Sequence, residues 1–314
     1  MIRASAPGKL VLMGEYAVLA GQPAIVAAVD VRAECVREGG PLEIARDEDG
    51  LIAACLQIAA TATAEIDGRI DVDTEAFRAG GIKYGLGSSA AACVALLRAL
   101  LPNLQLDQLH DLAQRAHRKF QRGKGSGVDV CASVFGGIQR FVRRDDDVTE
   151  VKALPPLPDG VALLPVWTGI SADTRAYLAS IERAFGESSP FMAGGSHEID
   201  RILRQLGAAS QEFQLATFPE DLFVAVDEAH DALRRLGELA GANIVSAQHS
   251  AIATIARACG GAAKPSGAGG GDISLCFVGE PEARDCTQRL ETAGFRVLDL
   301  VVGAPGVDVV GDGA

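Results

Sequence analysis

The pattern of hydrophobic and polar positions along the chain predicts a mixture of strands and helices. Short apolar runs at residues 10–13 and 24–31 are bounded by glycine and proline, which is typical of paired strands joined by tight turns. Longer apolar patterns predict helices at residues 51–64, 88–101 and 106–121. A shorter helical pattern at residues 128–135 ends at two glycines, after which residues 138–142 predict a return to the sheet.

The second half of the chain begins with a change of composition. Residues 145–160 combine three consecutive aspartates with a proline-rich stretch, and they are the predicted linker or domain crossing. Residues 161–167 then predict a strand, and helical patterns dominate residues 172–259. The last apolar segments predict a strand, a helix and a strand, at residues 273–278, 281–293 and 295–301. Because 314 residues is long for one core, the chain is predicted to form two domains.

Composition and charge restrict the classes of partner. Hydrophobic residues make up 48% of the chain and charged residues 22%, which is typical of a packed globular protein. The formal net charge of -12 argues against a nucleic-acid partner or an anionic membrane surface, since both require a broad basic face. A small anionic substrate is still compatible with this charge if the cationic groups are local. The sequence leaves open whether the protein is a monomer or a homodimer.

The cysteines and the apolar runs indicate a compartment. The seven cysteines are scattered and form no C-x-x-C pair, which favours a reduced cytosol and argues against a structural zinc site. The N-terminus lacks the basic and apolar pattern of a secretory signal, and the apolar runs are far shorter than the ~18 residues of a membrane span. The protein is therefore expected to be cytoplasmic.

Three glycine-containing segments, far apart in the chain, each have the composition of an anion-binding loop. They are Ala-Pro-Gly-Lys at residues 6–9, Gly-Leu-Gly-Ser-Ser-Ala-Ala at 85–91 and Lys-Pro-Ser-Gly-Ala-Gly-Gly-Gly-Asp at 264–272. The middle segment runs directly into an apolar helical pattern, so glycine amides and a helix N-terminus would face the same point. That arrangement favours a phosphate, and the three segments together predict phosphoryl transfer.

Other interpretations of the middle segment are weaker. It is not a Walker A motif, because the Gly-Lys-Ser/Thr ending is missing, but Gly85, Gly87 and Ala90 satisfy a loose dinucleotide fingerprint. A dinucleotide site requires a buried strand just before the first glycine, whereas residues 78–84 (RAGGIKY) are polar and interrupted by glycine. A plain glycine turn with Ser88 as the helix N-cap is the structural alternative, and the two further loops argue against it.

The three segments resemble the signature regions of the GHMP kinase superfamily, which includes galactokinase, homoserine kinase, mevalonate kinase and phosphomevalonate kinase. The first region continues as Gly-Glu-Tyr-Ala-Val at residues 14–18, and the matches occur in the expected order over almost the whole chain. The resemblance implies a two-domain α+β fold with a cleft between the halves. Residues 1–155 would form the ATP-binding, ribosomal protein S5 domain 2-like domain, and residues 156–314 the ferredoxin-like C-terminal domain.

Several local features resemble the phosphomevalonate kinase branch. The third loop ends in Gly-Asp, whereas mevalonate kinases tend to end it in Gly-Cys. The other features of this branch are Lys83-Tyr84, Ala116-His117, the Gly-Ser-Gly-Val-Asp-Val stretch at 125–130 and Trp167-Thr168-Gly169. The resemblance implies phosphorylation of 5-phosphomevalonate by MgATP to give 5-diphosphomevalonate. Mevalonate kinase, the related diphosphomevalonate decarboxylase and a catalytically silent ligand-binding member of the fold are the alternatives.

The resemblance also implies site residues. The implied ATP-binding residues are Lys83, Gly85, Leu86, Gly87, Ser88, Ser89 and Ala90. The implied substrate-binding residues are Lys9, Gly14, Glu15, Tyr16, Ser126, Gly127, Asp129, Ser266, Gly267, Ala268 and Gly269. Ser88 is the candidate Mg²⁺ ligand, and the rest of the ligand set stays open because residues 113–117 lack the glutamate that mevalonate kinases use.

Lys9 and Asp129 are the predicted catalytic residues. The transition state of phosphoryl transfer spreads negative charge over the phosphoryl oxygens, so a positioned cation such as Lys9 would stabilise it. An alcohol acceptor would need a carboxylate such as Asp129 to take its proton, whereas a phosphate acceptor is already an anion and needs only orientation. The alternatives are a solvated lysine after a turn and an aspartate that stabilises the first turn of a helix. Pro7 and Gly8 are expected to place Lys9 at the start of a strand, which favours the functional role.

Other charged and aromatic residues have two interpretations each. Four basic residues either recruit a doubly anionic substrate or compensate a helix dipole, and they are Arg118, Lys119, Arg122 and Lys124. Asp272 is expected either to contact a ligand or to accept hydrogen bonds from the amides of its own glycine-rich turn. The sole tryptophan, Trp167, is expected in a core or at a domain boundary. Four histidines have no metal-binding spacing and are expected on the surface or packed within helices: His110, His197, His230 and His249.

Overall fold

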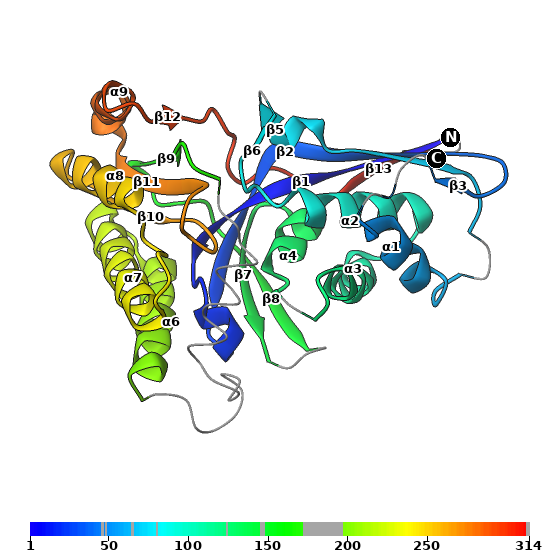
Figure 1. The fold of residues 1–314 in the computed structure, drawn as a ribbon, viewed down its shortest axis with the longest axis horizontal. Helices are drawn as coiled ribbons and strands as arrows, with labels where there is room; N and C mark the ends of the chain where they lie inside the picture. The colour runs from blue at the N-terminus through cyan, green and yellow to red at the C-terminus, as the bar shows by residue number, and fades with distance from the viewer. Residues whose placement is uncertain are drawn as a thin grey trace.

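Two sheets with their covering helices form the molecule. A computed structural model of the chain describes residues 1–44, 47, 49–63, 66–79, 81–123, 125–144, 148–171 and 197–311. Within these residues a seven-stranded sheet has its helices on one side, and a four-stranded sheet is covered by a second group of helices (Figure 1). A two-stranded hairpin, β5 (Arg78–Ala79) and β6 (Ile82–Lys83), precedes the glycine loop that starts at Gly85.

The seven-stranded sheet is built around two long antiparallel strands. These are β1 (Ile2–Met13) and β2 (Ala24–Glu38), and the path through the sheet is β13-β1-β2-β4-β3, with β7 pairing to both β2 and β8. The shorter strands are β3 (Glu43–Ile44), β4 (Arg69–Asp73), β7 (Ile138–Arg143), β8 (Thr149–Leu154) and β13 (Asp308–Gly311). The strands predicted at 10–13 and 24–31 are confirmed but longer, because both continue through segments that mix buried and exposed residues.

Helix α2 is the centre of the first half. It spans Ser88–Leu100 and all of its residues but Ser89 are buried, because the sheet lies on one side of it and α1 and α3 on the other. Its alanines and its single cysteine allow this close packing. The helices around it are α1 (Leu51–Ala59), α3 (Leu106–Phe120) and α4 (Val128–Phe135). The predicted helices are confirmed here, although α1 ends several residues before the predicted position 64.

The four-stranded sheet belongs to the second half of the chain. Its order is β10-β11-β9-β12, all antiparallel, with β9 (Val161–Trp167) and β11 (Ile273–Gly279) in its middle. The remaining elements are β10 (Ala262–Pro265), β12 (Arg296–Val297), α6 (His197–Leu215), α7 (Pro219–Ala240), α8 (Ala247–Ala258) and α9 (Ala283–Thr292). Three short 3₁₀ helices are described as well: η1 (Ala17–Ala20), η2 (Glu75–Phe77) and η3 (Glu280–Glu282). In the described part of the chain, no helix is both long enough and apolar enough to cross a membrane.

Some predicted elements need correction. The predicted linker at 145–160 contains β8, which pairs with β7 in the first sheet, so a strand replaces part of the expected crossing. The predicted closing strand at 295–301 shortens to β12. The three aspartates of the linker and the first part of the predicted helical region, residues 172–196, lie outside the described residues. The domain boundary at residue 155 stays a prediction.

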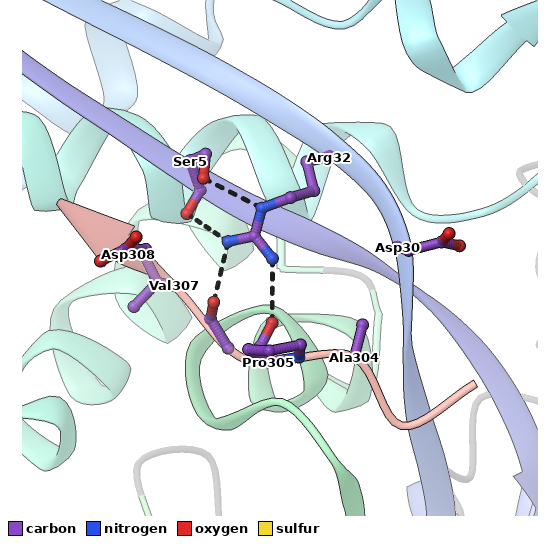
Figure 2. A pocket seen from close by; sticks show the side chains of 8 residues that line it. Ser5, Asp30, Arg32, Ala304, Pro305, Val307 and Asp308 are labelled. Atoms are coloured by element: carbon purple, nitrogen blue, oxygen red, sulfur yellow. Dashed lines mark hydrogen bonds between the residues drawn. The ribbon is translucent and has the colours of Figure 1, made fainter. Parts of the chain in front are cut away.

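The end of the chain returns to the first sheet. Strand β13 pairs antiparallel with the start of β1, with Ile2 opposite Gly311 (Figure 1). Arg32 fixes the segment before it: its guanidinium donates to the Ser5 hydroxyl and to the carbonyls of Ser5, Pro305 and Gly306 at 2.8–2.9 Å (Figure 2). A cavity of about 450 Å³ lies beside this arginine, along β1, β2 and the C-terminal segment rather than at the glycine loops. We therefore assign this cavity no role in the chemistry.

Helix α3 carries a buried histidine whose protonation opposes folding. His110 is 3% exposed, and its Nε2 lies 3.0 Å from the Gln114 side-chain amide, which donates to a neutral ring. Burial lowers the pKa of His110 from 6.5 to about 4, against a weaker opposing effect of Asp107.

This histidine predicts a pH dependence of stability. As the pH falls below 6.5 the unfolded chain binds a proton at His110, and the folded chain does not until about pH 4. As the pH decreases from 6.5 to about 4, the free energy of unfolding therefore decreases, by roughly 1.4 kcal/mol per pH unit from this group. Urea unfolding at several pH values would measure the slope. His110→Leu should flatten it by that amount, and an unchanged slope in the variant would contradict the assignment.

Candidate active site

The first and second glycine segments meet at Lys9. This residue lies inside β1, is 8% exposed, and its backbone N–H donates to the Leu86 carbonyl at 2.8 Å. Its ammonium Nζ donates to the Gly85 carbonyl at 3.1 Å. The expectation that Lys9 starts a strand was wrong, since β1 begins at Ile2. A register shift in the β1–β2 ladder just before Lys9, between Pro7 and Gly8, accounts for the proline and glycine there.

Gly87 brings the second loop close to both predicted catalytic residues. A Cβ built on Gly87 would lie 3.0 Å from Lys9 Cγ and 3.7 Å from Asp129 Cβ, so a side chain here would crowd the lysine. The residue also has a φ of 80°, which favours glycine, and it is the N-cap of α2. Ser88 is therefore the first helical residue and not the N-cap of the structural alternative. The first-turn amides of α2 face the end of this loop, as an anion site requires.

Asp129 lies in the first turn of α4, after a loop that neighbouring elements hold in place. The Gln114 side-chain amide of α3 donates to the Gly127 carbonyl at 2.8 Å, and Arg143 of β7 donates to the Gly125 carbonyl at 3.1 Å. The Ser126 hydroxyl accepts the Val128 N–H at 3.4 Å. The backbone before Asp129 is thus fixed from two sides.

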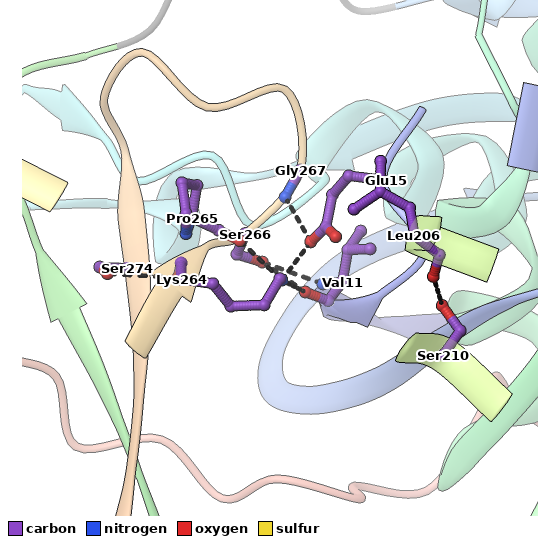
Figure 3. Close-up of polar contacts among 9 residues, drawn as sticks. All are labelled: Val11, Glu15, Leu206, Ser210, Lys264, Pro265, Ser266, Gly267 and Ser274. Atoms are coloured by element: carbon purple, nitrogen blue, oxygen red, sulfur yellow. Dashed lines mark hydrogen bonds and ion pairs between the residues drawn. The ribbon is translucent and has the colours of Figure 1, made fainter. Parts of the chain in front are cut away.

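A buried ion pair joins the third loop to the first. Lys264 of β10 and Glu15 are 0% and 1% exposed, and Lys264 Nζ lies 2.5 Å from Glu15 Oε1 (Figure 3). The same ammonium donates to the carbonyls of Pro265 and Val11, at 2.7 and 3.5 Å. Burial lowers the pKa of Lys264, and the Glu15 carboxylate opposes that shift. Glu15 Oε1 also accepts the Gly267 N–H at 3.4 Å, so the pair anchors the beginning of the loop.

The third loop contacts the first at further points. The Ser266 hydroxyl accepts the Val11 N–H at 3.0 Å, where β1 has its second register shift (Figure 3). The Tyr16 hydroxyl donates to the Ala268 carbonyl at 2.5 Å. A Cβ on Gly267 would lie 3.8 Å from Lys9 Nζ, so this end of the loop faces the lysine. The Gly269 end packs against Ile244 instead.

Asp272 reaches the second loop. A Cβ on Gly85 would clash with the Asp272 carboxylate, which occupies the space beside this glycine. The backbone of Asp272 has a φ of 54° and is bonded to the 168–170 turn on both sides: its carbonyl accepts the Thr168 N–H and its N–H donates to Ile170. All three glycine segments are therefore in mutual contact.

Two aromatic rings connect the halves next to the second loop. Trp167 is buried at the end of β9, and its ring lies edge-to-face against Tyr84, with centroids 5.2 Å apart. Arg296 of β12 donates to the Tyr84 hydroxyl at 2.9 Å. The expectation that Trp167 fills a core or boundary is confirmed.

Some predicted site residues lie apart from the convergence. Lys83 is exposed in the β5–β6 hairpin. Gly14 packs closely against Pro23 and Ala24, where a Cβ would clash, and not against the other glycine segments. Of the basic cluster, Arg118 and Lys119 are on α3 and Arg122 follows it, whereas Lys124 lies outside the described residues. The roles of all predicted site residues stay predictions. Among described residues, no group of three or more His, Cys, Asp or Glu side chains is arranged to hold a metal ion.

The contacts of two buried polar residues at the site could not be predicted from the sequence. Lys264 lies in the third glycine segment, but nothing local marks this lysine as buried or ion-paired. His117 lies on α3, and its Nε2 is 3.1 Å from the Ser89 hydroxyl of another helix. The spacing of charges along the sequence carries no signal for either contact.

Comparisons with known proteins give a family match and several similar kinases. Residues 50–137 match the GHMP kinases N terminal domain. The phosphomevalonate kinase of Streptomyces sp. (strain CL190) is 28% identical, over 96% of this chain and 97% of that protein. The chain therefore contains a GHMP kinases N terminal domain. GHMP kinases use ATP as co-substrate, so this match supports ATP-dependent kinase activity.

Other GHMP kinases are similar to different extents. The mevalonate kinase of Aeropyrum pernix (strain ATCC 700893 / DSM 11879 / JCM 9820 / NBRC 100138 / K1) is 32% identical, over 60% of this chain and 65% of that protein. The Streptococcus pneumoniae phosphomevalonate kinase, solved in complex with phosphomevalonate and AMPPNP, matches with a TM-score of 0.83 at 18% identity, over 96% of this chain and 100% of that one. The predicted α+β fold of a two-domain GHMP kinase is confirmed.

Proposed function

We propose that this GHMP kinase transfers the terminal phosphoryl group of ATP to the phosphate of 5-phosphomevalonate, giving 5-diphosphomevalonate and ADP. The observation that carries the proposal is the meeting of three glycine segments around Lys9, with Asp129 beside the second of them. A similarity to a phosphomevalonate kinase over nearly the full length of both chains supports this acceptor. The local features of that branch in the sequence support it as well.

Lys9 would act on the transferred phosphoryl group, and Asp129 would act on the acceptor. Lys9 is a cation at the meeting point of the loops, and it would stabilise the negative charge on the phosphoryl oxygens in the transition state. Asp129 would orient the acceptor, since a phosphate needs no proton removed before it attacks. The amides at the start of α2 and the Ser88 and Ser89 hydroxyls would bind the nucleotide phosphates.

The donor atoms at the loop are compatible with Mg²⁺. This ion prefers oxygen ligands and commonly binds through one or two protein groups together with substrate phosphates and water. Ser88 offers a hydroxyl oxygen at the start of α2 and would hold the ion with the nucleotide. When bound, Mg²⁺ neutralises charge on the phosphate oxygens.

Mevalonate kinase is the second candidate. The similarity to mevalonate kinases favours it, and so does a carboxylate at Asp129 that would take the proton of an alcohol. The absence of a glutamate in residues 113–117 argues for the phosphate acceptor instead. A catalytically silent member of the fold is disfavoured because Lys9, Ser88 and Asp129 are all present.

An acceptor comparison tests the proposal. Purified protein with MgATP would be incubated separately with 5-phosphomevalonate and mevalonate, while ADP release is followed. We expect kcat/KM to be at least about tenfold higher for 5-phosphomevalonate, because one well-placed phosphate contact contributes on the order of 1.4 kcal/mol. Faster turnover of mevalonate would favour mevalonate kinase. If neither acceptor gives ADP release, both candidate functions are rejected.

A further inference from the structure

A buried histidine contacts the glycine loop from within the core. His117 lies in the last turn of α3 and is 1% exposed. Its Nε2 is 3.1 Å from the hydroxyl of Ser89, the second residue of α2. Ser89 is partly exposed, unlike the buried residues on either side of it. The imidazole therefore reaches from the core to the one partly exposed hydroxyl at the start of this helix.

The contact restricts the Ser89 side chain. A serine at a helix N-terminus ordinarily samples more than one χ1 rotamer, and its hydroxyl proton rotates. The neutral imidazole has one donor and one acceptor nitrogen, so its Nε2 donates to the Ser89 oxygen in one tautomer and accepts the Ser89 O–H in the other. Burial lowers the pKa of His117, opposed by the nearby Asp129, which agrees with a neutral ring.

We propose that His117 is a positioning residue for the nucleotide: it fixes the Ser89 hydroxyl beside the first-turn amides of α2, where a nucleotide phosphate would meet it already ordered. A group held in its bound rotamer contributes more to affinity, because binding then costs no further ordering of that side chain. This inference rests on the proposed role of the loop in binding ATP, but it does not depend on the identity of the acceptor.

A purely structural role for His117 is the competing explanation. The ring packs within α3, with its centroid 6.0 Å from that of Phe120, and its loss would lower stability in any case. Such a role would act independently of Ser89. A positioning role acts through Ser89 alone, so its effect must vanish once the Ser89 hydroxyl has been removed.

A double-mutant cycle on nucleotide binding separates the two explanations. The affinity of the intact protein for AMPPNP, with no acceptor present, would be measured calorimetrically for the unmodified chain, His117→Leu, Ser89→Ala and the double variant. We expect each single substitution to weaken binding about three- to tenfold, as the loss of one hydrogen bond would. The double variant should bind within about twofold of Ser89→Ala. His117→Gln, which keeps a polar atom, should recover part of the loss.

His230→Leu is the matched control. His230 is 4% exposed on α7, in the other half of the molecule, so its replacement also removes a buried imidazole. It should lower stability while leaving AMPPNP affinity unchanged. Circular dichroism would establish that each variant is folded at the temperature of the titration.

Three results would overturn the inference. The first is a folded His117→Leu variant with unchanged affinity, and the second is a double variant whose loss equals the product of the two single losses. The third is an unmodified protein that does not bind AMPPNP, which would reject the ATP-binding role of the loop together with the proposed function. If binding follows the cycle but 5-phosphomevalonate is not phosphorylated, only the proposed acceptor fails.

Discussion

Lys9→Met is expected to reduce kcat on the order of 10³-fold while leaving the fold intact. The transition state of phosphoryl transfer spreads negative charge over the equatorial oxygens and the leaving group, so a cation at Lys9 that is placed to stabilise this distribution would act mainly on kcat. Removal of a single group that stabilises such charge typically costs about 10² to 10³ in rate. Methionine keeps the length of the side chain and removes the ammonium. Steady-state ADP release with saturating acceptor would measure the effect.

The structural consequences of Lys9→Met should be small by comparison. The Gly85 carbonyl loses its ammonium donor, which we expect to cost about 1 kcal/mol of stability. The backbone bond from Lys9 to the Leu86 carbonyl does not depend on the side chain and should persist. Lys152→Met, at an exposed lysine on β8, is the matched control and should keep full activity. A folded Lys9→Met protein with unchanged turnover would remove Lys9 from the mechanism.

Much of the fold could be predicted where local pattern and burial coincide. Helix α4 has the predicted bounds, and α2 and α3 differ from prediction by one residue each, because each combines an apolar pattern with a glycine or polar residue at its start. The outer parts of β1 and β2 were missed, since small or polar residues interrupt the apolar runs there, although Ala4, Ala6 and Cys35 are buried. Strand β13 was missed for another reason: its partner, the start of β1, lies about 300 residues away, and four residues of weak pattern cannot identify it.

The candidate site was also predictable only in part. The glycine motifs predicted which segments would converge, since backbone anion sites depend on residue types that the sequence displays directly. The bonds that hold the segments together were not predictable. Lys264 and Glu15 are 249 positions apart, and Ser89 and His117 are 28 apart on different helices. Such contacts depend on how the sheets pack, and a lysine destined for the core looks the same in sequence as one on the surface.

Lys264→Met is expected to lower the free energy of unfolding by about 3–5 kcal/mol. The substitution leaves the Glu15 carboxylate buried without its cation, and an uncompensated buried charge is strongly destabilising. The carbonyls of Pro265 and Val11 lose a donor as well. Within the described residues Glu15 Oε2 has no hydrogen-bond partner, so Lys264 is the main compensation for this charge. Urea unfolding at neutral pH would measure the loss. An m-value equal to that of the unmodified protein would show that unfolding is still two-state.

The double variant Glu15→Gln, Lys264→Met gives the sharper test. Because it removes both charges, it should be more stable than Lys264→Met, even though it carries one substitution more. Asp227→Asn is the matched control: its carboxylate pairs with Arg257 at 3.0 Å on the surface, with side chains 37% and 42% exposed, and it should change stability by less than about 1 kcal/mol. If the Glu15 and Lys264 losses simply add, the two groups do not compensate each other. The third loop would then be held by its contacts at Ser266 and Tyr16, and the buried pair would not be its anchor.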